Sequence, residues 1–457
     1  MSKGVTPKSE NFSKWYTDII TKAELADYGP VKGTMIIRPY GYQIWDNIKN
    51  IFDKEFKKTG HVNAYFPLFI PKSFLNKEAE HVEGFAKECA IVTHSRLKVN
   101  EEGSLAPDPD SKLEEEVIVR PTSETVIWSM YKKWINSHRD LPILINQWAN
   151  VVRWEMRTRL FLRTSEFLWQ EGHTAHKTEE EAIDETLKIL NIYQDVVENY
   201  MGIPLTIGKK SETEKFAGAV DTYTIEAMMG DKKALQAGTS HYLGQNFSKA
   251  FDVKYQDVDN KEKYVYATSW GVTTRLIGAL IMVHGDDKGL RLPPKVAPIQ
   301  IVIVPIFKSE EDKQTIINYI QPLIDELEQS DIRILFDDRS KMSPGFKFNE
   351  WEMKGVPIRL EIGLRDIADN IIIYSRRDQD GKHSIPITNS SSCLIDVLGD
   401  IQDSLFNQAK KFQTENTFST NSYDEFKSII DKGGFVQCGW DGSAETEEKI
   451  KSETKAT

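Results

Sequence analysis

The hydrophobic pattern of the chain changes near residue 295, and this change limits the possible folds more than any other feature. A proline-rich stretch, RLPPKVAP, is followed by the nearly continuous apolar run IQIVIVPIF. Such a run is typical of a strand in a parallel sheet that is buried on both faces. It is followed by a helical pattern with Ser309 as a possible N-cap, and then by the strand patterns IRILFD, PIRLEI and NIIIYSR. This alternation predicts a separate α/β domain over residues 295–409.

The first 294 residues have the mixed pattern of an α+β domain. Apolar residues recur at helical spacing over Ile44–Phe56, and residues 178–202 form the clearest helical pattern, beginning with a capping box. The run VNAYFPLFIP predicts a short strand that is broken by Pro67 and Pro71, and these prolines place it at an edge or an interface because proline cannot donate to a neighbouring strand. Strands and turns fill most of residues 203–270.

Two further segments of this domain combine a β-rich or glycine-containing stretch with a helix. The run Val117–Arg120 leads into PTSETVIWSMYKKWI, where Thr122 or Ser123 can cap a helix. The segment SWGVTTRLIGALIMVHG predicts a glycine turn followed by a buried helix. Residues 410–457 are more polar and weakly patterned, which predicts a small C-terminal α+β segment.

Composition excludes several classes of protein. The chain has 457 residues, 40% of them hydrophobic, which is enough for two or three packed domains. No apolar run approaches the roughly 20 residues that span a bilayer, and the N-terminal stretch lacks the apolar core of a signal peptide. Cys89, Cys393 and Cys438 lie far apart, which argues against a disulfide framework and a complete zinc site. We therefore expect a cytoplasmic protein without a membrane segment or a bound metal centre.

The net charge of −11 argues against a general affinity for nucleic acid. Acidic residues outnumber basic residues in each of the three segments, whereas nucleic-acid-binding domains usually carry a basic patch. A nucleic-acid partner must therefore be inferred from motifs.

The stretch RWEMRTRLFLRTSEFLWQEGHTA concentrates arginine, glutamate and aromatic residues at 153–175. If EFLWQEGH is the second arm of a hairpin, with RTRLFLRT as its loop, side chains two residues apart share one face. That face holds a guanidinium, carboxylates, an indole and an imidazole, which suits a ligand of mixed charge. A solvated, salt-bridged hairpin is the alternative. The residues that would share the face are Arg153 with Glu155, and Phe167 with Trp169, Glu171 and His173.

An ordered series of motifs identifies the family that the chain resembles. Pro67 after a helix and glycine, RPTSET at 120–125, RWE at 153–155 and WGVTTR at 270–275 resemble the three-motif core of class II aminoacyl-tRNA synthetases. The segments RPTSE, WQEGHTAH, KFAGA, GTSHYLGQNF and HGDDKGLRLPP are similar to prolyl-tRNA synthetases of the archaeal and eukaryotic type. The resemblance extends over nearly the whole chain.

This resemblance implies three domains and a reaction. It implies a catalytic domain with an antiparallel sheet at 1–294, an α/β anticodon-binding domain at 295–409, and an apparently incomplete C-terminal domain at 410–457. It also implies a homodimer that attaches L-proline to tRNA(Pro) in two steps, with ATP and Mg²⁺. Positioning and charge neutralisation suffice for this chemistry, so no covalent nucleophile is needed.

The resemblance also implies the residues of the site. Arg153 and Arg275 would be catalytic. The ATP-binding residues would be Arg153, Glu155, Arg163, Thr164, Phe167, Gln236, Thr239, Thr273 and Arg275. The proline-binding residues would be Thr122, Glu124, Arg153, Trp169, Glu171, His173, Phe216 and His241.

Other expectations and alternatives concern the periphery of this site. The distance in sequence between Arg153 and Arg275 leaves no room for the large editing insertion of bacterial relatives, and Cys438 alone cannot build a zinc site. Arg339, Lys341 and Lys347 could form a local cationic edge for tRNA, and Arg157 and Arg159 could serve ATP, tRNA or only solvent. A catalytically silent relative that binds RNA or protein, and a ligase for another amino acid, remain as alternatives.

Overall fold

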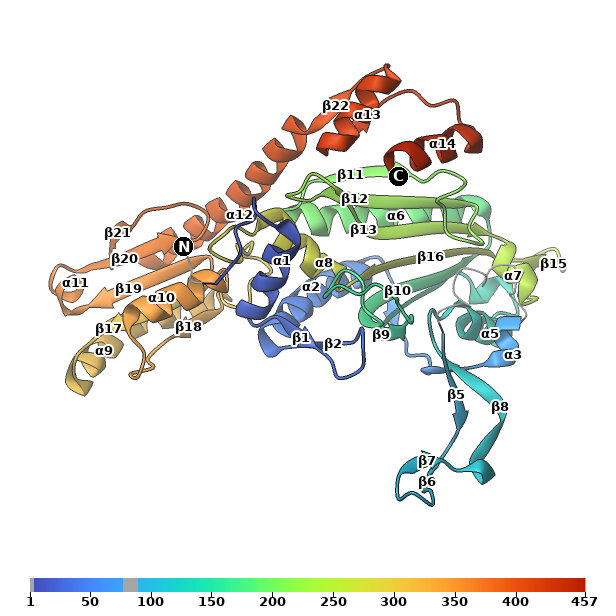
Figure 1. The fold of residues 1–457 in the computed structure, drawn as a ribbon, viewed down its shortest axis with the longest axis horizontal. Helices are drawn as coiled ribbons and strands as arrows, with labels where there is room; N and C mark the ends of the chain where they lie inside the picture. Colours follow the sequence, from blue (N-terminus) through green and yellow to red (C-terminus); the bar gives the residue numbers. More distant parts are fainter. Residues whose placement is uncertain (1–3, 77–88, 457) are drawn as a thin grey trace.

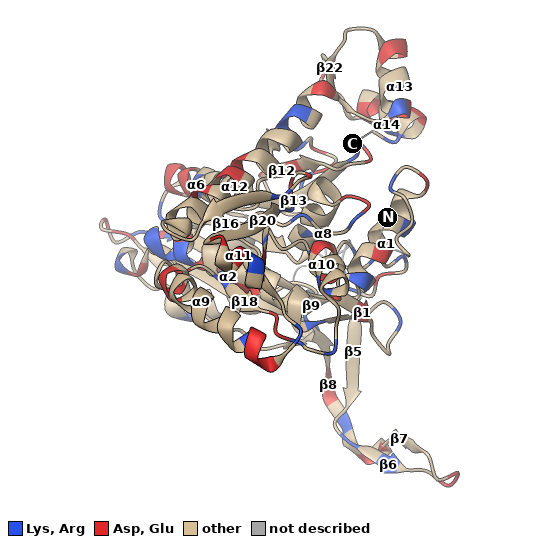
Figure 2. Ribbon diagram, turned by 90° about the vertical axis from the view of Figure 1, so that its left-hand side faces the viewer, with Lys and Arg blue, Asp and Glu red and all other residues tan. Residues whose placement is uncertain are grey.

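The computed structural model describes residues 4–76 and 89–456. Its centre is a seven-stranded sheet, a second five-stranded sheet lies beside it, and a C-terminal segment lies above the first sheet (Figure 1). Lysine and arginine are interspersed with aspartate and glutamate along the ribbon (Figure 2). None of the helices in the described part of the chain is long and apolar enough to cross a membrane.

The seven-stranded sheet is antiparallel except at one edge. The strand order is β11-β12-β13-β16-β10-β9-β3, and only the pair β3–β9 is parallel. The strands are β3 (Val62–Asn63), β9 (Ile143–Val152), β10 (Glu166–His176), β11 (Leu205–Lys209), β12 (Asp221–Met228), β13 (Ala234–Gly244) and β16 (Tyr266–Thr273).

Helices cover both faces of this sheet. The largest apolar core contains residues of α1 (Phe12–Lys22), α2 (Pro39–Lys58), α6 (Glu179–Asn199) and α8 (Arg275–His284), packed against Trp270 and Val272 of β16. A second core contains residues of α5 (Glu124–Trp134) and α7 (Asn246–Ala250), packed against Ala175 and Ala267. The second core and the ligand-binding side chains described below lie on the same face of the sheet, because strand side chains alternate.

The predicted helices of this domain are present, with some local differences. Helix α2 begins at Pro39, earlier than the periodic stretch predicted, because proline is favoured in the first turn. Helix α6 begins after Thr178, whose hydroxyl accepts from the amide of Glu181 at 3.2 Å. The Glu181 carboxylate accepts from the amide of Lys177 rather than from that of Thr178, so the predicted box is only half formed.

The run VNAYFPLFIP forms β3 and β4 (Phe69–Pro71), two short strands with the predicted break at Pro67 between them, and both lie at sheet edges, as expected. One local prediction was wrong. The stretch SWGVTT is not a turn, since β16 continues through Gly271 to Thr273. Pairing with β10 on one side and β13 on the other outweighs the low strand preference of glycine there.

The second sheet has the predicted α/β architecture. Its order is β18-β17-β19-β20-β21, parallel around β17 and antiparallel at β20 and β21. Strand β17 is buried on both faces, since Ile301 and Ile303 join one core while Val302 and Val304 join another. The elements are β17 (Ile301–Ile306), α9 (Glu310–Gln329), β18 (Ile334–Phe336), α10 (Pro344–Met353), β19 (Ile358–Gly363), α11 (Leu364–Ala368), β20 (Ile371–Arg376), β21 (His383–Pro386) and α12 (Ser390–Glu415).

Helix α12 links the second sheet to the C-terminal segment. It runs across residue 409, where we expected a domain boundary, and Gln402 donates to the carbonyl of Tyr200 at 3.1 Å, at the end of α6. The C-terminal segment then returns toward β11 and β12 (Figure 1). Its elements are β22 (Thr417–Ser419), α13 (Tyr423–Lys432), β23 (Phe435–Gln437) and α14 (Ala444–Thr454).

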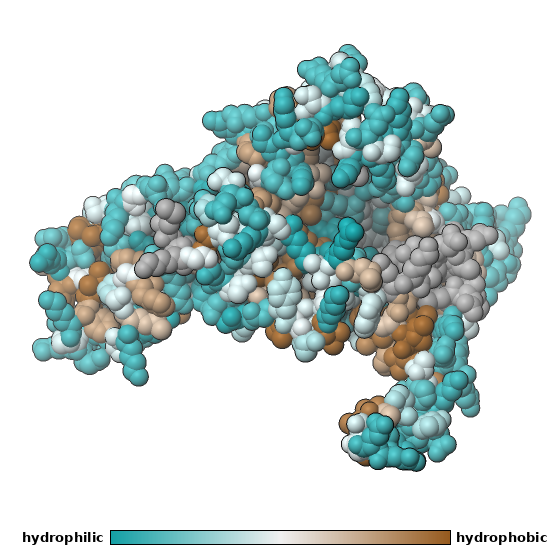
Figure 3. All heavy atoms as spheres, viewed as in Figure 1, coloured by the Kyte–Doolittle hydropathy of each residue, from teal (hydrophilic) through white to brown (hydrophobic). Residues whose placement is uncertain are grey.

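A β-arm projects from the domain that contains the seven-stranded sheet. Leu97, Val99 and Leu105 near its tip are exposed, and apolar atoms are visible there in Figure 3. The arm contains β5 (Ala90–His94), β6 (Leu97–Val99), β7 (Leu105–Pro107) and β8 (Lys112–Val119), with a short 3-10 helix at Pro109–Ser111. Other short elements of the described residues are β1 (Ala26–Tyr28), β2 (Met35–Ile37), α3 (Lys72–Asn76), a 3-10 helix at His138–Asp140, β14 (Lys254–Gln256) and β15 (Glu262–Tyr264).

Candidate active site

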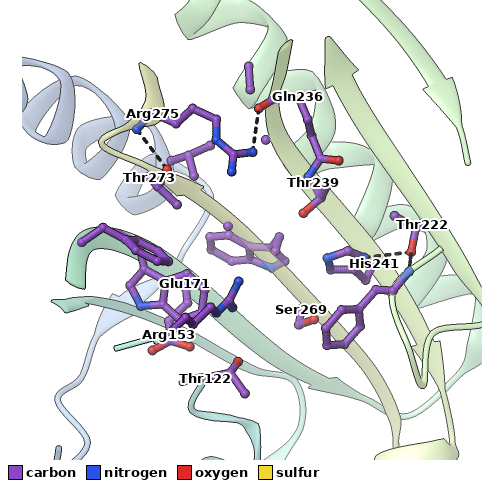
Figure 4. A pocket seen from close by; sticks show the side chains of 18 of the residues that line it. Thr122, Arg153, Glu171, Thr222, Gln236, Thr239, His241, Ser269, Thr273 and Arg275 are labelled. Atoms are coloured by element: carbon purple, nitrogen blue, oxygen red, sulfur yellow. Dashed lines mark hydrogen bonds between the residues drawn. The ribbon is translucent and has the colours of Figure 1, made fainter. Parts of the chain in front are cut away.

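A cavity of about 290 Å³ lies over the seven-stranded sheet, and every residue predicted for the site lines it (Figure 4). Side chains from β10, β13, β16 and the start of α5 converge on it, although they are far apart in sequence. The predicted residues along its wall are Thr122, Glu124, Arg153, Glu155, Arg163, Thr164, Phe167, Trp169, Glu171, His173, Phe216, Gln236, Thr239, His241, Thr273 and Arg275.

The hairpin predicted around Arg153 is present as β9 and β10. Strand β10 places Phe167, Trp169, Glu171 and His173 on one face, as expected. Arg153 and its neighbours lie beyond the end of β9, so their placement does not follow from strand alternation. The loop brings Arg153 back instead, through its amide, which donates to the carbonyl of Ser165 at 2.8 Å.

Arg153 lies between the aromatic side chains of β10 and the start of α5. Its Nε donates to the carbonyl of Pro121 at 3.0 Å, and its guanidinium carbon lies 5.6 Å from the Phe167 ring and 5.5 Å from the Trp169 ring. These contacts orient a fork-shaped cation at the cavity wall.

Arg275 supplies a second cation at the opposite wall, where β16 ends and α8 begins (Figure 4). Its Nε donates to the carbonyl of Leu162 at 3.2 Å and its Nη1 to the carbonyl of Gln236 at 3.3 Å. Burial lowers the pKa of Arg275, but an arginine remains charged in proteins. Because these partners are neutral carbonyls, the site favours an anionic ligand.

Glu171 is a buried carboxylate that already has several hydrogen-bond donors. Ser123 Oγ and Gln147 Nε2 donate to its Oε1 at 2.5 and 2.6 Å, and His173 Nε2 lies 3.1 Å from its Oε2. Burial alone raises the pKa of Glu171, but the hydrogen bonds from His173, Ser123 and Gln147 outweigh it, so the pKa is lowered. Glu171 is therefore ionised and holds the floor of the cavity in place.

Glu124 is the carboxylate that remains available for a ligand. It is the first residue of α5, and the Thr122 hydroxyl donates to its Oε2. Within residues 4–76 and 89–456, no hydrogen bond reaches its Oε1. Burial lowers the pKa of His173. The hydrogen bond to Glu171 and the negative charges of Glu124 and Glu171 have a larger opposite effect, so the pKa of His173 is raised overall.

Phe216 and His241 form an aromatic wall of the cavity. The rings of Phe216 and His241 lie 4.8 Å apart, and Thr222 Oγ1 lies 2.9 Å from His241 Nδ1. Burial, with smaller contributions from the cations His173 and Lys210, lowers the pKa of His241 to about 3. A neutral imidazole packed against phenylalanine, with the two rings tilted by 34°, forms a wall suited to an apolar ring.

Three family models match the chain. A model of the tRNA synthetase class II core domain (G, H, P, S and T) matches residues 107–284, and an anticodon binding domain model matches residues 300–396. A model of the prolyl-tRNA synthetase C-terminal domain matches residues 423–457. These three matches correspond to the central sheet, the second sheet and the C-terminal segment.

Curated proteins named “Proline--tRNA ligase” match over the whole chain. The protein of Azobacteroides pseudotrichonymphae is 58% identical over 456 residues, with 100% of this chain and 92% of that protein covered. The chain belongs to the prolyl-tRNA synthetases. The protein of Porphyromonas gingivalis is also 58% identical with the same coverage, and that of Cytophaga hutchinsonii is 56% identical over 459 residues, covering 100% of this chain and 94% of that protein. The predicted fold class of a class II core with anticodon-binding and C-terminal domains is confirmed.

The sequence analysis missed several residues of the site. Ser123 was considered only as a helix cap, but its hydroxyl makes no capping bond and donates to Glu171 instead. Gln147 lies directly opposite Glu171 in the pairing of β9 with β10, so strand register could have identified it. The other cavity residues without a predicted role include Lys210, Glu214, Thr222 and Ser269.

The structure assigns contacts to several cations that the sequence left open. Arg159 packs on Tyr16, with its guanidinium carbon 4.6 Å from the ring, whereas Arg157 is exposed. The cationic edge proposed for Arg339, Lys341 and Lys347 was wrong for Lys347, which is buried and donates to the carbonyl of Asp337 at 2.8 Å, whereas Lys341 is exposed. Arg339 binds the carboxylates of Asp337 and Glu350, so its charge is largely neutralised locally.

Proposed function

We propose that the protein attaches L-proline to tRNA(Pro) through a prolyl-adenylate. The observation that carries this proposal is a single cavity that combines two cations, Arg153 and Arg275, with an available carboxylate and an aromatic wall. The cations suit ATP phosphates, and the carboxylate and the aromatic wall suit the cationic secondary amine and the apolar ring of proline. The names of its relatives support the same function. A catalytically silent relative would not need both arginines in this arrangement.

In the first step, a carboxylate oxygen of proline attacks the α-phosphorus of ATP, and pyrophosphate leaves. We assign Arg153 to the proline carboxylate and the α-phosphate, and Arg275 to the phosphates and one side of the adenine ring. Both are held before the substrates bind, so charge neutralisation needs little reorganisation. The other nucleotide contacts would come from Glu155, at the adenine amino group, Phe167, on the other side of the ring, and Arg163, Thr164, Gln236, Thr239 and Thr273.

The proline side of the cavity selects the amino acid. Glu124 would accept from the ring nitrogen, supported by Thr122, while the hydrogen-bonded pair of Glu171 and His173 fixes the cavity floor. The pyrrolidine ring of proline would be surrounded by the side chains of Trp169, Phe216 and His241. A pocket of this kind gains only about 1–3 kcal/mol per methylene, so we expect imperfect discrimination against alanine.

In the second step, a hydroxyl of the 3′-terminal ribose of tRNA attacks the prolyl carbonyl, and AMP leaves. The domain of residues 300–396, which matches an anticodon binding domain, would contact the other end of the tRNA.

Mg²⁺ would be held by ATP phosphates together with protein oxygens. This cation needs only one or two protein ligands and keeps several waters. Gln236 and Thr239 of β13 offer an amide and a hydroxyl oxygen at the cavity wall near Arg275 (Figure 4). When bound, Mg²⁺ would neutralise part of the phosphate charge. In the described residues, no group of three His, Cys, Asp or Glu side chains forms a metal site.

Three further parts of the proposal concern the type of enzyme. We propose a homodimer of the archaeal and eukaryotic type that acts in the cytoplasm, where tRNA is charged for translation. Because β10 to β16 follow Arg153 without a large additional domain, we propose that the chain does not edit in cis. Hydrolysis of alanyl-tRNA by this chain alone would contradict that part, and a monomer in light scattering would contradict the homodimer.

The decisive experiment is ATP–pyrophosphate exchange with each of the twenty amino acids, followed by aminoacylation of tRNA(Pro). We expect exchange with proline and weaker exchange with alanine. No exchange with any amino acid would favour a silent relative, and exchange with another amino acid alone would identify a different ligase.

A further inference from the structure

The loop between β11 and β12 connects the cavity to the C-terminal helix α14. On its inner side, Lys210, Glu214 and Phe216 line the cavity. Only part of this loop is fixed by the sheet: the amide of Phe216 donates to Thr222 Oγ1 at 3.0 Å, and Asn246 Nδ2 donates to the carbonyl of Gly218 at 2.9 Å. The stretch from Ser211 to Glu214 precedes these contacts and projects toward α14.

Helix α14 binds that stretch through two charged side chains on one face. Ser211 Oγ donates to Glu447 Oε1 at 2.5 Å, and Lys451 Nζ forms an ion pair with Glu214. Glu447 and Lys451 are four residues apart, so they lie on the same side of the helix. Hydrogen bonds from Ser211 and Thr213 lower the pKa of Glu447, which is consistent with a carboxylate that binds the loop.

Helix α14 is only weakly packed against the rest of the protein, so its contacts with the loop matter for its position. None of its residues is buried. Tyr423 Oη of α13 donates to Glu453 Oε2 at 3.0 Å, and Thr446 Oγ1 donates to Asp441 Oδ2 at 2.7 Å just before the helix. Figure 1 shows α14 above the β11–β12 end of the sheet.

We propose that α14 positions the amino-acid pocket by holding loop 210–216 in place through Glu447 and Lys451. Glu214, which Lys451 binds, lies two residues before Phe216, whose ring packs against His241. Loss of the contacts frees residues 211–214, which lead into Phe216, so the position of the Phe216 ring against His241 becomes less well fixed. Glu447 and Lys451 are thus positioning residues, remote from the reacting atoms.

The test compares four variants with the unchanged chain: Glu447→Ala, Lys451→Met, their combination, and Glu447→Gln. Hydrogen–deuterium exchange is followed at the amides of residues 211–216, and KM for proline and for ATP is measured in pyrophosphate exchange. Glu445→Ala is the matched control, because it removes the same charge from an exposed position of α14.

We expect faster amide exchange in the loop and a KM for proline about fivefold higher in Glu447→Ala, as for the loss of one hydrogen bond, with kcat and the KM for ATP little changed. Glu447→Gln should show loop exchange and a KM for proline close to those of the unchanged chain, because the glutamine amide oxygen can still accept from Ser211. Unchanged loop exchange in the combined variant, or a proline KM within twofold of the unchanged chain, would overturn the proposal.

The KM readout rests on the proposed function, whereas the loop exchange does not. If the unchanged chain shows no proline-dependent pyrophosphate exchange, the proposed function fails. In that case, the amide exchange of residues 211–216 still decides whether α14 holds the loop. Exchange at α13 is monitored in parallel, so that general loss of the C-terminal segment is recognised; faster exchange in α13 together with an unchanged loop would also count against the proposal.

Discussion

The two carboxylates on the proline side of the cavity differ in their surroundings, and this difference separates their roles. Glu171 accepts hydrogen bonds from Ser123, Gln147 and His173, so it has little capacity left for a ligand. Glu124 has one oxygen bound to Thr122 and another facing no donor in the described residues. At the residue scale, ligand binding therefore depends on Glu124 and rigidity depends on Glu171.

We predict that Glu124→Gln lowers kcat/KM for proline in pyrophosphate exchange by about 10- to 100-fold, because a hydrogen bond to a charged group contributes about 1.5–3 kcal/mol. KM for ATP should change little, since Glu124 is assigned to the ring nitrogen of proline and not to the nucleotide. Glu180→Gln, an exposed position of α6, is the control. An equal loss for proline and ATP would contradict the assignment.

Arg275 gives a second prediction at this scale. A lysine cannot keep both bonds of the guanidinium, to the carbonyls of Leu162 and Gln236, while also facing the phosphates. We expect Arg275→Lys to lower kcat of adenylate formation about 100-fold, in the range found for loss of one preorganised transition-state donor. Single-turnover measurements should show this loss, and a rate within threefold of the unchanged chain would refute the role.

At the element scale, the pairing of β10 with β16 sets the floor of the cavity. Gly172 lies opposite Trp270, and a Cβ at Gly172 would lie 2.1 Å from that indole ring. The indole is buried, so it has little room to move. Gly172 thus allows Trp270 to fill the core directly beneath Glu171 and His173.

We predict that Gly172→Ala destabilises the catalytic domain by about 1–3 kcal/mol, because overpacking a dense core displaces its side chains. Gly208→Ala is the matched control: Gly208 is also in a strand of this sheet, and nothing lies within 4 Å of a Cβ there. Urea unfolding followed by tryptophan fluorescence measures both. Equal stability of the two variants would exclude the steric role of Gly172.

Elements that depend on local pattern could be predicted from the sequence. The cap at Thr178, the helix after Ser309 and the doubly buried strand IVIVPI each follow from short-range spacing, and all are present. Every residue that the motifs named for the site lines one cavity. Their individual roles stay predictions until they are measured.

Features that depend on contacts distant in sequence could not be predicted in this way. The hydroxyl of Ser123 could cap α5 or bind a carboxylate. It binds Glu171, because the fold places that carboxylate within hydrogen-bond distance. Gly271 lies in a strand because neighbours on both sides pair with it. Lys347 is buried because Asp337 lies next to it, 10 positions earlier in the chain.

At the scale of the whole molecule, buried histidines couple stability to pH. Burial lowers the pKa of His284 to about 4 and that of His176 to about 4, below the ordinary value of 6.5. The unfolded chain therefore takes up these protons first as the pH falls. Stability that is complete above pH 6.5 is lost progressively as the pH falls toward 4.

The free energy of unfolding should decrease between pH 7 and pH 5. We predict that this decrease is about 2 kcal/mol smaller in His284→Gln, as the pKa difference between the folded and unfolded states implies. The variant should be less stable at pH 7, because the bond from His284 Nε2 to the carbonyl of Met201 is altered. Urea unfolding at both pH values tests this, and a pH dependence equal to that of the unchanged chain would contradict it.

Helix α12 is one continuous helix of 26 residues that begins beside the second sheet, bonds to the end of α6, and carries the C-terminal segment. A helix turns by about 100° and rises about 1.5 Å per residue, so one inserted residue rotates everything beyond it by more than a quarter turn. Such a rotation swings Glu447 and Lys451 away from Ser211 and Glu214. The length of α12 therefore helps to set the position of the loop beside the amino-acid pocket. Insertions or deletions in α12 keep Glu447 and Lys451 facing Ser211 and Glu214 only when they come close to whole helical turns.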